Sequence, residues 1–371
     1  MRVGLNATCF NERASGAKQR FIGIYGELIR RLPGTEFIVY EPEDCKVSSW
    51  FSGSGNVTPR LTPLPSDGRV KRLVKGLGYW PQIQNLDGLD LFECFNLPLT
   101  HSRKVRTVLT IHDIRGVYLG RSALQRLTYR LALKREFNRT DHIITVSESM
   151  KQEIIDIYPC AEISVVRNGI DVKRFDDITT TDCEIFRGRY NLPKEPILSV
   201  GHFEQRKNYL RLIDALAKLR DEGQDLNLVI VGNDSGERKR IQERIDASNL
   251  NQRVTLLSGL SDLEVRCAYK LASLFVFPSS YEGFGIPILE AMAAGCPMVL
   301  SDIPVFREIT QNRGIYFPFD DVDALAESIG RILSSSSQRE KSVGYGKERV
   351  EAFTFKTLAE QMESVYRKLI V

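Results

Sequence analysis

Residues 277–295 read FPSSYEGFGIPILEAMAAG, and their pattern is the most informative about the architecture of the chain. An apolar run over residues 274–277 leads into it, a loop with two glycines follows, and an alanine-rich apolar run covers residues 286–294. A short apolar run is typical of a buried strand, and Pro287 suits the first turn of a helix. The stretch therefore predicts a strand, a loop and a helix that packs closely on a sheet.

The same alternation of strand and helix extends along the chain in both directions. Ile22, Tyr25 and Ile29 recur at helical spacing, whereas residues 226–231 form a nearly continuous apolar run that suits a parallel sheet covered on both faces. We predict an α/β, doubly wound fold. The expected strands are residues 2–6, 36–40, 105–111, 142–146, 196–200, 226–231, 254–257, 274–277 and 297–300. The expected helices are residues 22–32, 208–222, 237–248, 261–271 and 286–294.

A polar segment separates two such halves. Residues 171–196 are rich in Asp and Thr, and a new strand begins after Pro196. The length of 371 residues is also comfortable for two domains. We expect an N-terminal domain over residues 1–173 and a C-terminal domain over residues 174–354, with a helix over residues 355–371 that packs back on the first.

Composition excludes several classes of protein. Hydrophobic residues make up 42% and charged residues 26%, which is typical of a globular chain and not of a disordered or coiled-coil one. The sequence shows neither a membrane-spanning run nor a secretory leader, and the seven cysteines are scattered without a Cys-x-x-Cys pair. We expect a cytoplasmic protein with reduced thiols.

The net charge of +4 hides an asymmetry. Residues 1–175 carry 26 Lys and Arg against 18 Asp and Glu, a net of +8, whereas the remainder carries 25 against 29, a net of −4. A basic first half suits an anionic partner, either a membrane surface or a phosphorylated acceptor, although surface charge also drifts without a function.

Several candidate residues follow the expected strands, where ligands bind in open α/β sheets. Gly16, with Lys18 and Arg20 after it, suits an anion near a helix start, or is a plain turn. His112 ends a buried strand and either faces a cleft or packs in the core. Gly201 ends a later strand, and Arg206 and Lys207 follow it. The two cations either bind a pyrophosphate or are solvated at the start of a helix, which Asn208 can cap.

Two glutamates stand within residues 277–295, Glu282 in the loop and Glu290 inside the helix. Glu290 lies four residues after Ile286 and can therefore face the same ligand as the loop. A carboxylate in an apolar helix needs a partner, and the hydroxyls of a ribose would serve.

Taken together, these segments resemble the retaining GT-B glycosyltransferases of family 4, also called glycosyl transferases group 1. The E-x7-E motif from Glu282 to Glu290 carries most of the resemblance, and the wording is most similar to bacterial mannosyltransferases that use GDP-mannose. The resemblance implies two Rossmann-like domains that face a central cleft. Supporting segments are residues 146–149, 168–171, 201–208, 231–232 and 301–304.

The resemblance also implies roles for individual residues. Glu290 is similar to the glutamate that binds the donor ribose, and Glu282 to the one near the transferred sugar. Arg206 and Lys207 match the cations of the diphosphate site, and His112 matches the histidine beside the donor sugar. The remaining matches are Gly16 and Gly201 near the diphosphate, Leu260 near the base, and the backbone N–H groups of Gly283, Phe284, Gly285 and Ile286 near sugar hydroxyls and phosphate.

Two departures from the family pattern change these expectations. Many relatives carry Arg where this chain has His202, which places more of the phosphate binding on Arg206 and Lys207. The N-terminal loop often reads Gly-x-Gly, whereas Ala17 and Lys18 follow Gly16 here. We therefore expect Lys18 or Arg20 to reach the phosphates or the acceptor.

The expected reaction is hexosyl transfer without a metal or other cofactor, since the histidines are dispersed and no Asp-x-Asp ends a strand. Cations and helix dipoles would then stabilise the leaving diphosphate. No second carboxylate suits a double displacement, so we favour a same-face reaction. The alternatives are a transferase of the same family that uses a UDP-sugar or dTDP-rhamnose as donor, a GT-B sugar-nucleotide epimerase, or a non-catalytic relative. A dinucleotide dehydrogenase is disfavoured because no G-x-G-x-x-G follows the first strand.

The expected partners are a nucleotide diphosphate sugar and a glycan or lipid-linked acceptor in bacterial cell-surface polysaccharide synthesis, and no nucleic acid. Residues 69–80 alternate cations with apolar residues. As a helix they place Val70, Leu73, Val74 and Leu77 on one face, with Tyr79 and Trp80 at the level of lipid headgroups. We expect peripheral contact with the anionic inner face of the cytoplasmic membrane, or else a helix that covers its own core.

Overall fold

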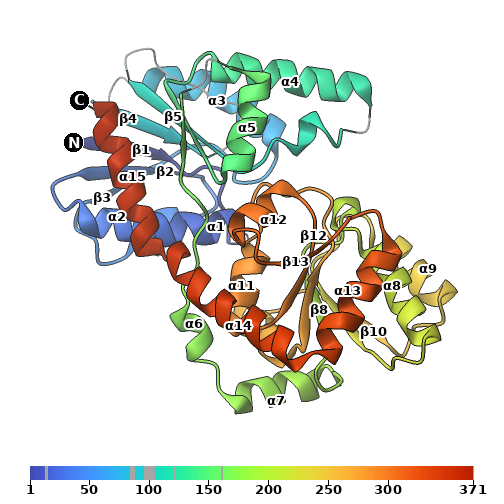
Figure 1. Ribbon diagram of the computed structural model, residues 1–371. Helices are drawn as coiled ribbons and strands as arrows, with labels where there is room; N and C mark the ends of the chain where they lie inside the picture. Colours follow the sequence, from blue (N-terminus) through green and yellow to red (C-terminus); the bar gives the residue numbers. More distant parts are fainter. Residues whose placement is uncertain (13–15, 84–87, 96–104, 121, 160–161, 371) are drawn as a thin grey trace. The chain divides into compact units, whose positions relative to one another are not determined.

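The computed structural model describes residues 1–371 except 13–15, 84–87, 96–104, 121, 160–161 and 371 (Figure 1). The chain forms two compact units. Unit 1 comprises Met1–Gly169 and Thr354–Val371, and unit 2 comprises Ile170–Phe353. The change of unit after Gly169 falls a few residues before the expected boundary at 173/174.

Unit 1 is built on a seven-stranded sheet with the order β3-β2-β1-β4-β5-β6-β7. Every pair of neighbouring strands is parallel, and Val3 of the central β1 lies opposite Phe37 of β2 and Leu91 of β4. The strands are β1 (Arg2–Asn6), β2 (Glu36–Glu41), β3 (Val57–Leu61), β4 (Leu91–Cys94), β5 (Arg106–Ile111), β6 (His142–Thr145) and β7 (Ile163–Val165).

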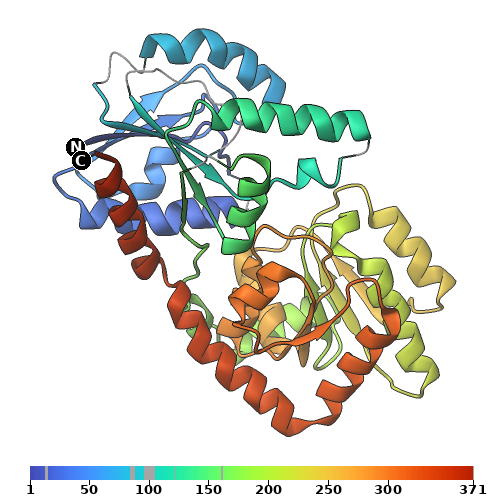
Figure 2. The ribbon, with the colours of Figure 1, turned by 45° about the horizontal axis from the view of Figure 1, so that its top comes forward.

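Helices cover both faces of this sheet (Figures 1 and 2). Helices α2 and α15 share one hydrophobic core with strands β1 and β2, whereas α3, α4 and α5 lie on the opposite side. The α-helices are α1 (Gly16–Arg20), α2 (Gly26–Arg31), α3 (Arg69–Ile83), α4 (Ala123–Phe137), α5 (Glu148–Ile157) and α15 (Phe355–Ile370). A π-helical segment, η1 (Phe21–Tyr25), joins α1 to α2, and two 3₁₀ helices are η2 (Val47–Phe51) and η3 (Arg115–Val117).

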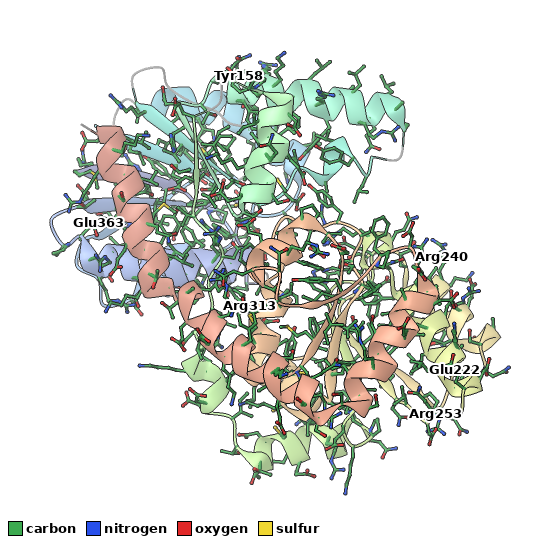
Figure 3. The ribbon with its side chains drawn as sticks, viewed as in Figure 1. Tyr158, Glu222, Arg240, Arg253, Arg313 and Glu363 are labelled. Carbon is green, nitrogen blue, oxygen red and sulfur yellow. The ribbon has the colours of Figure 1, made fainter. Side chains whose placement is uncertain are left out.

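Helix α15 returns the chain to unit 1 after all of unit 2. Its buried side chains include Leu358, Met362 and Tyr366, which lie in the core cluster of β1 and β2. On the outside of α15, Glu363 (labelled in Figure 3) accepts a hydrogen bond of 3.1 Å from Arg31 Nε of α2. Both apolar packing and an ion pair therefore hold this helix to the first part of the chain.

Unit 2 is built on a six-stranded parallel sheet with the order β10-β9-β8-β11-β12-β13. The strands are β8 (Ile197–Val200), β9 (Leu228–Val231), β10 (Val254–Leu257), β11 (Leu274–Phe277), β12 (Met298–Ser301) and β13 (Ile315–Phe317). The α-helices are α6 (Lys173–Asp176), α7 (Thr180–Arg189), α8 (Tyr209–Asp221), α9 (Arg238–Ala247), α10 (Asp262–Leu271), α11 (Ile286–Ala294), α12 (Pro304–Ile309), α13 (Val322–Ser334) and α14 (Ser336–Val350). The 3₁₀ helices are η4 (Gln205–Lys207) and η5 (Glu351–Phe353).

The strand order of unit 2 reverses between β8 and β11. The chain adds β9 and β10 on one side of β8 and then returns to place β11, β12 and β13 on the other. Connections that leave neighbouring strands in opposite directions open a crevice at the carboxyl ends of those two strands. The loops after β8 and β11 meet there.

The predicted doubly wound α/β architecture is confirmed in both sheets. All nine expected strands are present within one or two residues at each end, and the helix over residues 286–294 has the predicted bounds. The expected helix over residues 22–32 is instead continuous with α1, through the π-helical segment. Asn208 stands at the start of α8, but its side chain makes no capping bond, because its Oδ1 accepts from Arg211 Nη1 at 2.8 Å while its amide donates to the Phe319 carbonyl at 2.6 Å.

Candidate functional site

The crevice of unit 2 brings together three of the predicted site residues. Glu282, in the loop after β11, accepts from Lys207 Nζ at 2.8 Å and lies 2.6 Å from Arg206 Nη1, both through Oε1. Arg206 Nε also donates to Glu204 Oε2 at 2.7 Å. Two cations and two carboxylates therefore form one network at the strand ends.

Backbone contacts hold these two loops in register. Arg206 Nη1 donates to the Tyr281 carbonyl at 3.2 Å, and the Ser280 N–H donates to the Arg206 carbonyl at 2.8 Å. The loop after β8 and the loop after β11 are thus tied together by main-chain and side-chain bonds. The cations have a fixed geometry before any ligand arrives.

Burial and charge set the ionisation of this network. Burial lowers the pKa of Lys207, whose side chain is 7% exposed, although the neighbouring Glu282 charge opposes this shift. Burial alone would raise the pKa of Glu282, but the charges of Lys207 and Arg206 outweigh it and hold that pKa below its usual range. Glu282 is therefore an ionised, weakly basic carboxylate.

Gly201 makes room for the buried lysine. It ends β8 with a φ of +151°, and a Cβ added there would lie 2.7 Å from Lys207 Cε. The neighbouring Gly232, after β9, is as restricted, since a Cβ there would lie 1.9 Å from the Gly201 carbonyl oxygen. The two glycines therefore allow the Lys207 side chain and the main chain after β8 to pack closely at this end of the sheet.

The loop from Gly283 to Ile286 leads directly into α11. Gly285 precedes the helix with a φ of +144°, which glycine adopts readily. The Phe284 side chain is buried, and its ring centroid lies 6.0 Å from that of Phe353. The Phe284 side chain is thus a packing residue of unit 2, and a role of its backbone N–H toward a ligand stays a prediction.

Glu290 has a partner that the sequence did not indicate. The Tyr269 hydroxyl of α10 donates to Glu290 Oε2 at 2.8 Å. Burial raises the pKa of Glu290 to about 7, while the hydrogen bond from Tyr269 limits the rise. The protein itself thus provides one partner for this carboxylate, and the role of Glu290 toward a ribose stays a prediction.

Leu260 lies in the loop between β10 and α10. The loop is fixed by the Gly259 N–H, which donates to Asn233 Oδ1 at 3.0 Å, and by Arg238 Nη1, which donates to Ser258 Oγ at 2.9 Å. Leu260 is half-buried, and its preceding strand β10 is separated from β11 by β9 and β8 in the sheet. Its place at a carboxyl strand end is compatible with the predicted contact with a base.

Gly16 and His112 belong to unit 1. Gly16 is the first residue of α1, and the residues 13–15 of the same loop lie outside the described part of the chain. His112 directly follows β5. Burial, with a contribution from the Arg20 charge, lowers the pKa of His112 to about 3. The imidazole is therefore neutral at physiological pH and can form hydrogen bonds without serving as an acid.

The expectation that Arg20 reaches phosphates or the acceptor is wrong. Its side chain is 2% exposed, and Nη2 donates to the Val166 carbonyl at 2.9 Å inside unit 1. Lys18 is more accessible, but its Nζ lies 3.2 Å from Glu12 Oε2 and 4.3 Å from the centroid of the Trp50 ring.

The expected helix over residues 69–80 forms as α3, but Trp80 does not reach a surface. It is 3% exposed, and its ring packs against Tyr40 and Phe92 at centroid distances of 5.4 and 5.3 Å. Val70 and Leu77 are exposed, at 74% and 61%. The apolar stripe is present, whereas the headgroup-level tryptophan is a core residue.

Two residues that sequence reasoning missed are Glu204 and Tyr269. Glu204 precedes the Arg-Lys pair by two residues, which is a local signal for a charge partner. Tyr269 gives no such signal, because a tyrosine on the buried face of an amphipathic helix is most simply interpreted as a core residue.

The described residues contain no cluster of His, Cys, Asp and Glu that could hold a metal ion. None of the described helices combines the length and the apolar composition that a membrane span requires.

Two family models match separate parts of the chain. The model described as Glycosyltransferase Family 4 matches residues 34–174, and the model described as Glycosyl transferases group 1 matches residues 183–349. The second match contains the whole network of Arg206, Lys207, Glu282 and Glu290.

Curated relatives include several mannosyltransferases. The O-antigen chain mannosyltransferase RfbU of Salmonella typhimurium is 33% identical over 226 residues, which are 60% of this chain and 60% of the relative. The MMP alpha-(1->4)-mannosyltransferase of Mycolicibacterium hassiacum is 28% identical over 294 residues, 76% of this chain and 66% of the relative. The chain thus spans less than two thirds of the length of RfbU.

Solved structures share the fold along nearly the whole chain. Sucrose-phosphate synthase from Thermosynechococcus elongatus has a TM-score of 0.77 at 23% identity, and the match covers 99% of this chain and 98% of the synthase chain. Anabaena HepE, solved with UDP and glucose, has a TM-score of 0.76 at 18% identity and covers 99% and 100%. The fold is that of the GT-B glycosyltransferases; residues 183–349 belong to the family described as Glycosyl transferases group 1, and residues 34–174 to Glycosyltransferase Family 4.

Proposed function

We propose that the protein is a retaining mannosyltransferase that moves mannose from GDP-mannose to a glycan or lipid-linked acceptor in the synthesis of a bacterial surface polysaccharide. The names of RfbU and the other mannosyltransferase relatives support mannose and this pathway. The observation that carries the proposal is the network of Arg206, Lys207 and Glu282 at the reversal of strand order in unit 2. A nucleotide diphosphate there meets two oriented cations.

Charge development explains why the cations are needed. When the bond between the anomeric carbon and the phosphate oxygen breaks, positive charge grows on the sugar and negative charge on the leaving diphosphate. Arg206 and Lys207 stabilise that negative charge from positions fixed by Glu282 and Glu204. No step of this reaction requires a metal or other cofactor.

Retention follows if the acceptor attacks from the side that the diphosphate leaves. In this same-face reaction the departing phosphate oxygen takes the proton of the acceptor hydroxyl, and the hydroxyl oxygen bonds to the anomeric carbon. Glu282 is a poor candidate for a nucleophile or base, because both cations hold its Oε1 and its pKa is low. We assign it to orienting the cations and to hydrogen bonds with the transferred sugar.

His112 takes a different role in this scheme. With a pKa of about 3, its ring is neutral and provides one donor and one acceptor nitrogen. Such a ring can bind sugar hydroxyls without adding charge beside an oxocarbenium-like centre.

We also propose that unit 1 attaches peripherally to the anionic cytoplasmic face of a membrane. Helix α3 exposes Val70, Val74 and Leu77, and α4, on the same side of the sheet, exposes Leu124, Leu127 and Leu131 at 70%, 54% and 58%. The spacing of three and four residues aligns each set on one helix face. Exposed cations flank both stripes, Lys71 and Lys75 on α3 and Arg130, Lys134 and Arg135 on α4.

The enzymatic proposal is tested by incubating the protein with GDP-mannose, UDP-glucose, UDP-N-acetylglucosamine or dTDP-rhamnose and a lipid-linked acceptor analogue. We expect a mannosylated product whose new linkage has the anomeric configuration of GDP-mannose, as read by NMR. Transfer from another donor would overturn the choice of donor, and an inverted product would overturn the same-face reaction. A new sugar nucleotide from donor alone would signal an epimerase.

The membrane proposal is tested by sedimentation with anionic liposomes at low and high salt. Replacing Leu124, Leu127 and Leu131 by Gln should release the protein, and so should replacing the three apolar residues of α3. The matched control is Ile185→Gln in unit 2, an apolar residue of α7 that is 58% exposed. Undiminished sedimentation of both triple variants would exclude this surface.

A further inference from the structure

The two carboxylate oxygens of Glu290 have unequal surroundings. Oε2 accepts the hydrogen bond from the Tyr269 hydroxyl at 2.8 Å, whereas the described residues offer no donor to Oε1. Glu290 is half-buried, and Tyr269 is 1% exposed. The carboxylate is therefore fixed on its inner side by a core residue and has acceptor capacity left on Oε1.

Tyr269 itself is held rigidly. Its helix, α10, begins with a capping box in which Ser261 and Glu264 satisfy each other's backbone N–H groups. The tyrosine ring packs against Phe275 and Phe175 at centroid distances of 5.4 and 6.5 Å. Burial raises the pKa of Tyr269 well above its ordinary value, so the hydroxyl remains a hydrogen-bond donor.

We propose that Tyr269 is a positioning residue for Glu290: it holds Oε2 and leaves Oε1 to accept a hydroxyl of the donor's nucleoside sugar. This inference rests on the proposed function, because it assumes a nucleotide in the crevice of unit 2. It adds a residue from α10 to a site otherwise built from the loops after β8 and β11 and from α11.

The arrangement makes nucleotide binding depend on pH. Burial and the charge of Asp262 raise the pKa of Glu290 to about 7, while Tyr269, Arg174 and Lys207 oppose the rise. An ionised carboxylate is the stronger acceptor for a sugar hydroxyl. Affinity for a nucleoside diphosphate should therefore increase as the pH rises through 7 and level off above it.

The experiment is calorimetric titration of the whole protein with GDP and with UDP between about pH 5.5 and 8.5, together with NMR titration of the Glu290 carboxyl carbon. In Tyr269→Phe the carboxylate loses a stabilising donor, so the Glu290 midpoint and the acid limb of the affinity profile should both move up by about one pH unit. Affinity at pH 7 should fall several-fold and recover at high pH. Glu290→Gln should show no acid limb.

The matched control is Tyr190→Phe, which removes a second tyrosine–glutamate hydrogen bond of unit 2, between Tyr190 and Glu264 at 3.3 Å. It should leave the affinity profile unchanged. If Tyr269→Phe lowers affinity equally at every pH, or leaves the Glu290 midpoint in place, the positioning role is wrong while the proposed function stands. If neither nucleotide binds the wild-type protein at any pH, the proposed function fails and this inference with it.

Discussion

Glu93 of unit 1 and Glu290 of unit 2 are both carboxylates held by a buried tyrosine, yet they differ in how completely they are bound. Glu93 is 0% exposed, and its Oε1 accepts from Thr110 Oγ1 at 2.5 Å while its Oε2 accepts from the Tyr366 hydroxyl. Glu290 uses only Oε2 within the protein. Burial raises the pKa of both groups.

The difference separates a carboxylate that completes a core from one that is available to a ligand. Both oxygens of Glu93 are satisfied by hydroxyls from β5 and α15, and the buried Arg20 contributes an opposite charge nearby. Glu290 lies in the middle of α11 and is only half-buried. Removing Glu93 should therefore act on stability, and removing Glu290 or its neighbours should act on binding and turnover.

The largest effect is expected from the double variant Arg206→Ala, Lys207→Ala. It removes the charges that stabilise the leaving diphosphate, and loss of one such donor typically lowers the rate by about 10²–10³-fold. Steady-state transfer should fall by at least about 10³-fold, with an unchanged circular dichroism spectrum. Activity within a few-fold of wild type would indicate that Lys18, and not this pair, binds the diphosphate.

The variant Glu93→Ala should give the next largest effect, on the free energy of unfolding. It leaves the Thr110 and Tyr366 hydroxyls buried without an acceptor and Arg20 without its nearby opposite charge, at a cost of about 3–5 kcal/mol. Urea unfolding measures it. A variant as stable as wild type would contradict the structural role of Glu93.

A smaller effect on the free energy of unfolding is expected from Glu290→Gln, and its size depends on pH. The pKa of Glu290 rises from 4.5 to about 7 on folding, so its contribution to stability is fully present below pH 4.5 and is lost as the pH rises through 7. The ligand-free wild type should thus lose about 2–3 kcal/mol relative to the variant between these values. Paired urea curves at several pH values test this, and a constant difference would show that Glu290 ionises freely.

Donor binding gives the complementary readout for the same residue. Glu290→Ala should weaken nucleotide binding by about 1.5–3 kcal/mol through the loss of a charge-assisted hydrogen bond. Unchanged affinity in a titration with GDP-mannose would show that Glu290 does not bind the ribose. The proposed difference between Glu290 as a ligand-binding carboxylate and Glu93 as a structural one would then be wrong.

Metal removal should have the smallest effect. The carboxylate of Glu282 is neutralised by Arg206 and Lys207, and the described part of the chain contains no cluster able to hold a metal ion. Transfer measured with and without EDTA should agree within experimental error. A strict need for an added divalent cation would contradict the role of the two cations.

Strands whose residues favour a buried sheet were predicted from the sequence. Strands β1, β10 and β11 have the predicted bounds, and the apolar β9 begins two residues later than predicted. By contrast, β3 (Val57–Leu61) is an edge strand that contains Pro59 and is mostly exposed, so it shows no apolar pattern. Strand β4 contains Glu93, which reads as an interruption until its partner Tyr366, far along the chain, is known.

The candidate site was predictable as a set of positions and not as a set of contacts. The ends of β8 and β11 were expected to carry Lys207 and Glu282, but their hydrogen bond joins residues 75 positions apart and depends on which strands are neighbours. The burial of Arg20 was not predictable from the sequence, because its guanidinium donates to the carbonyl of Val166, a residue far along the chain. Spacing identifies residues that follow strands, whereas packing decides which of them remain accessible.

The return of the chain to unit 1 has a consequence for synthesis on the ribosome. Unit 2 ends at Phe353, whereas unit 1 lacks Leu358, Met362 and Tyr366 of its core until residues 355–370 have been synthesised. Until then the Oε2 atom of Glu93 has no hydroxyl donor from α15. The first-synthesised half of this protein is therefore the last to complete its native packing.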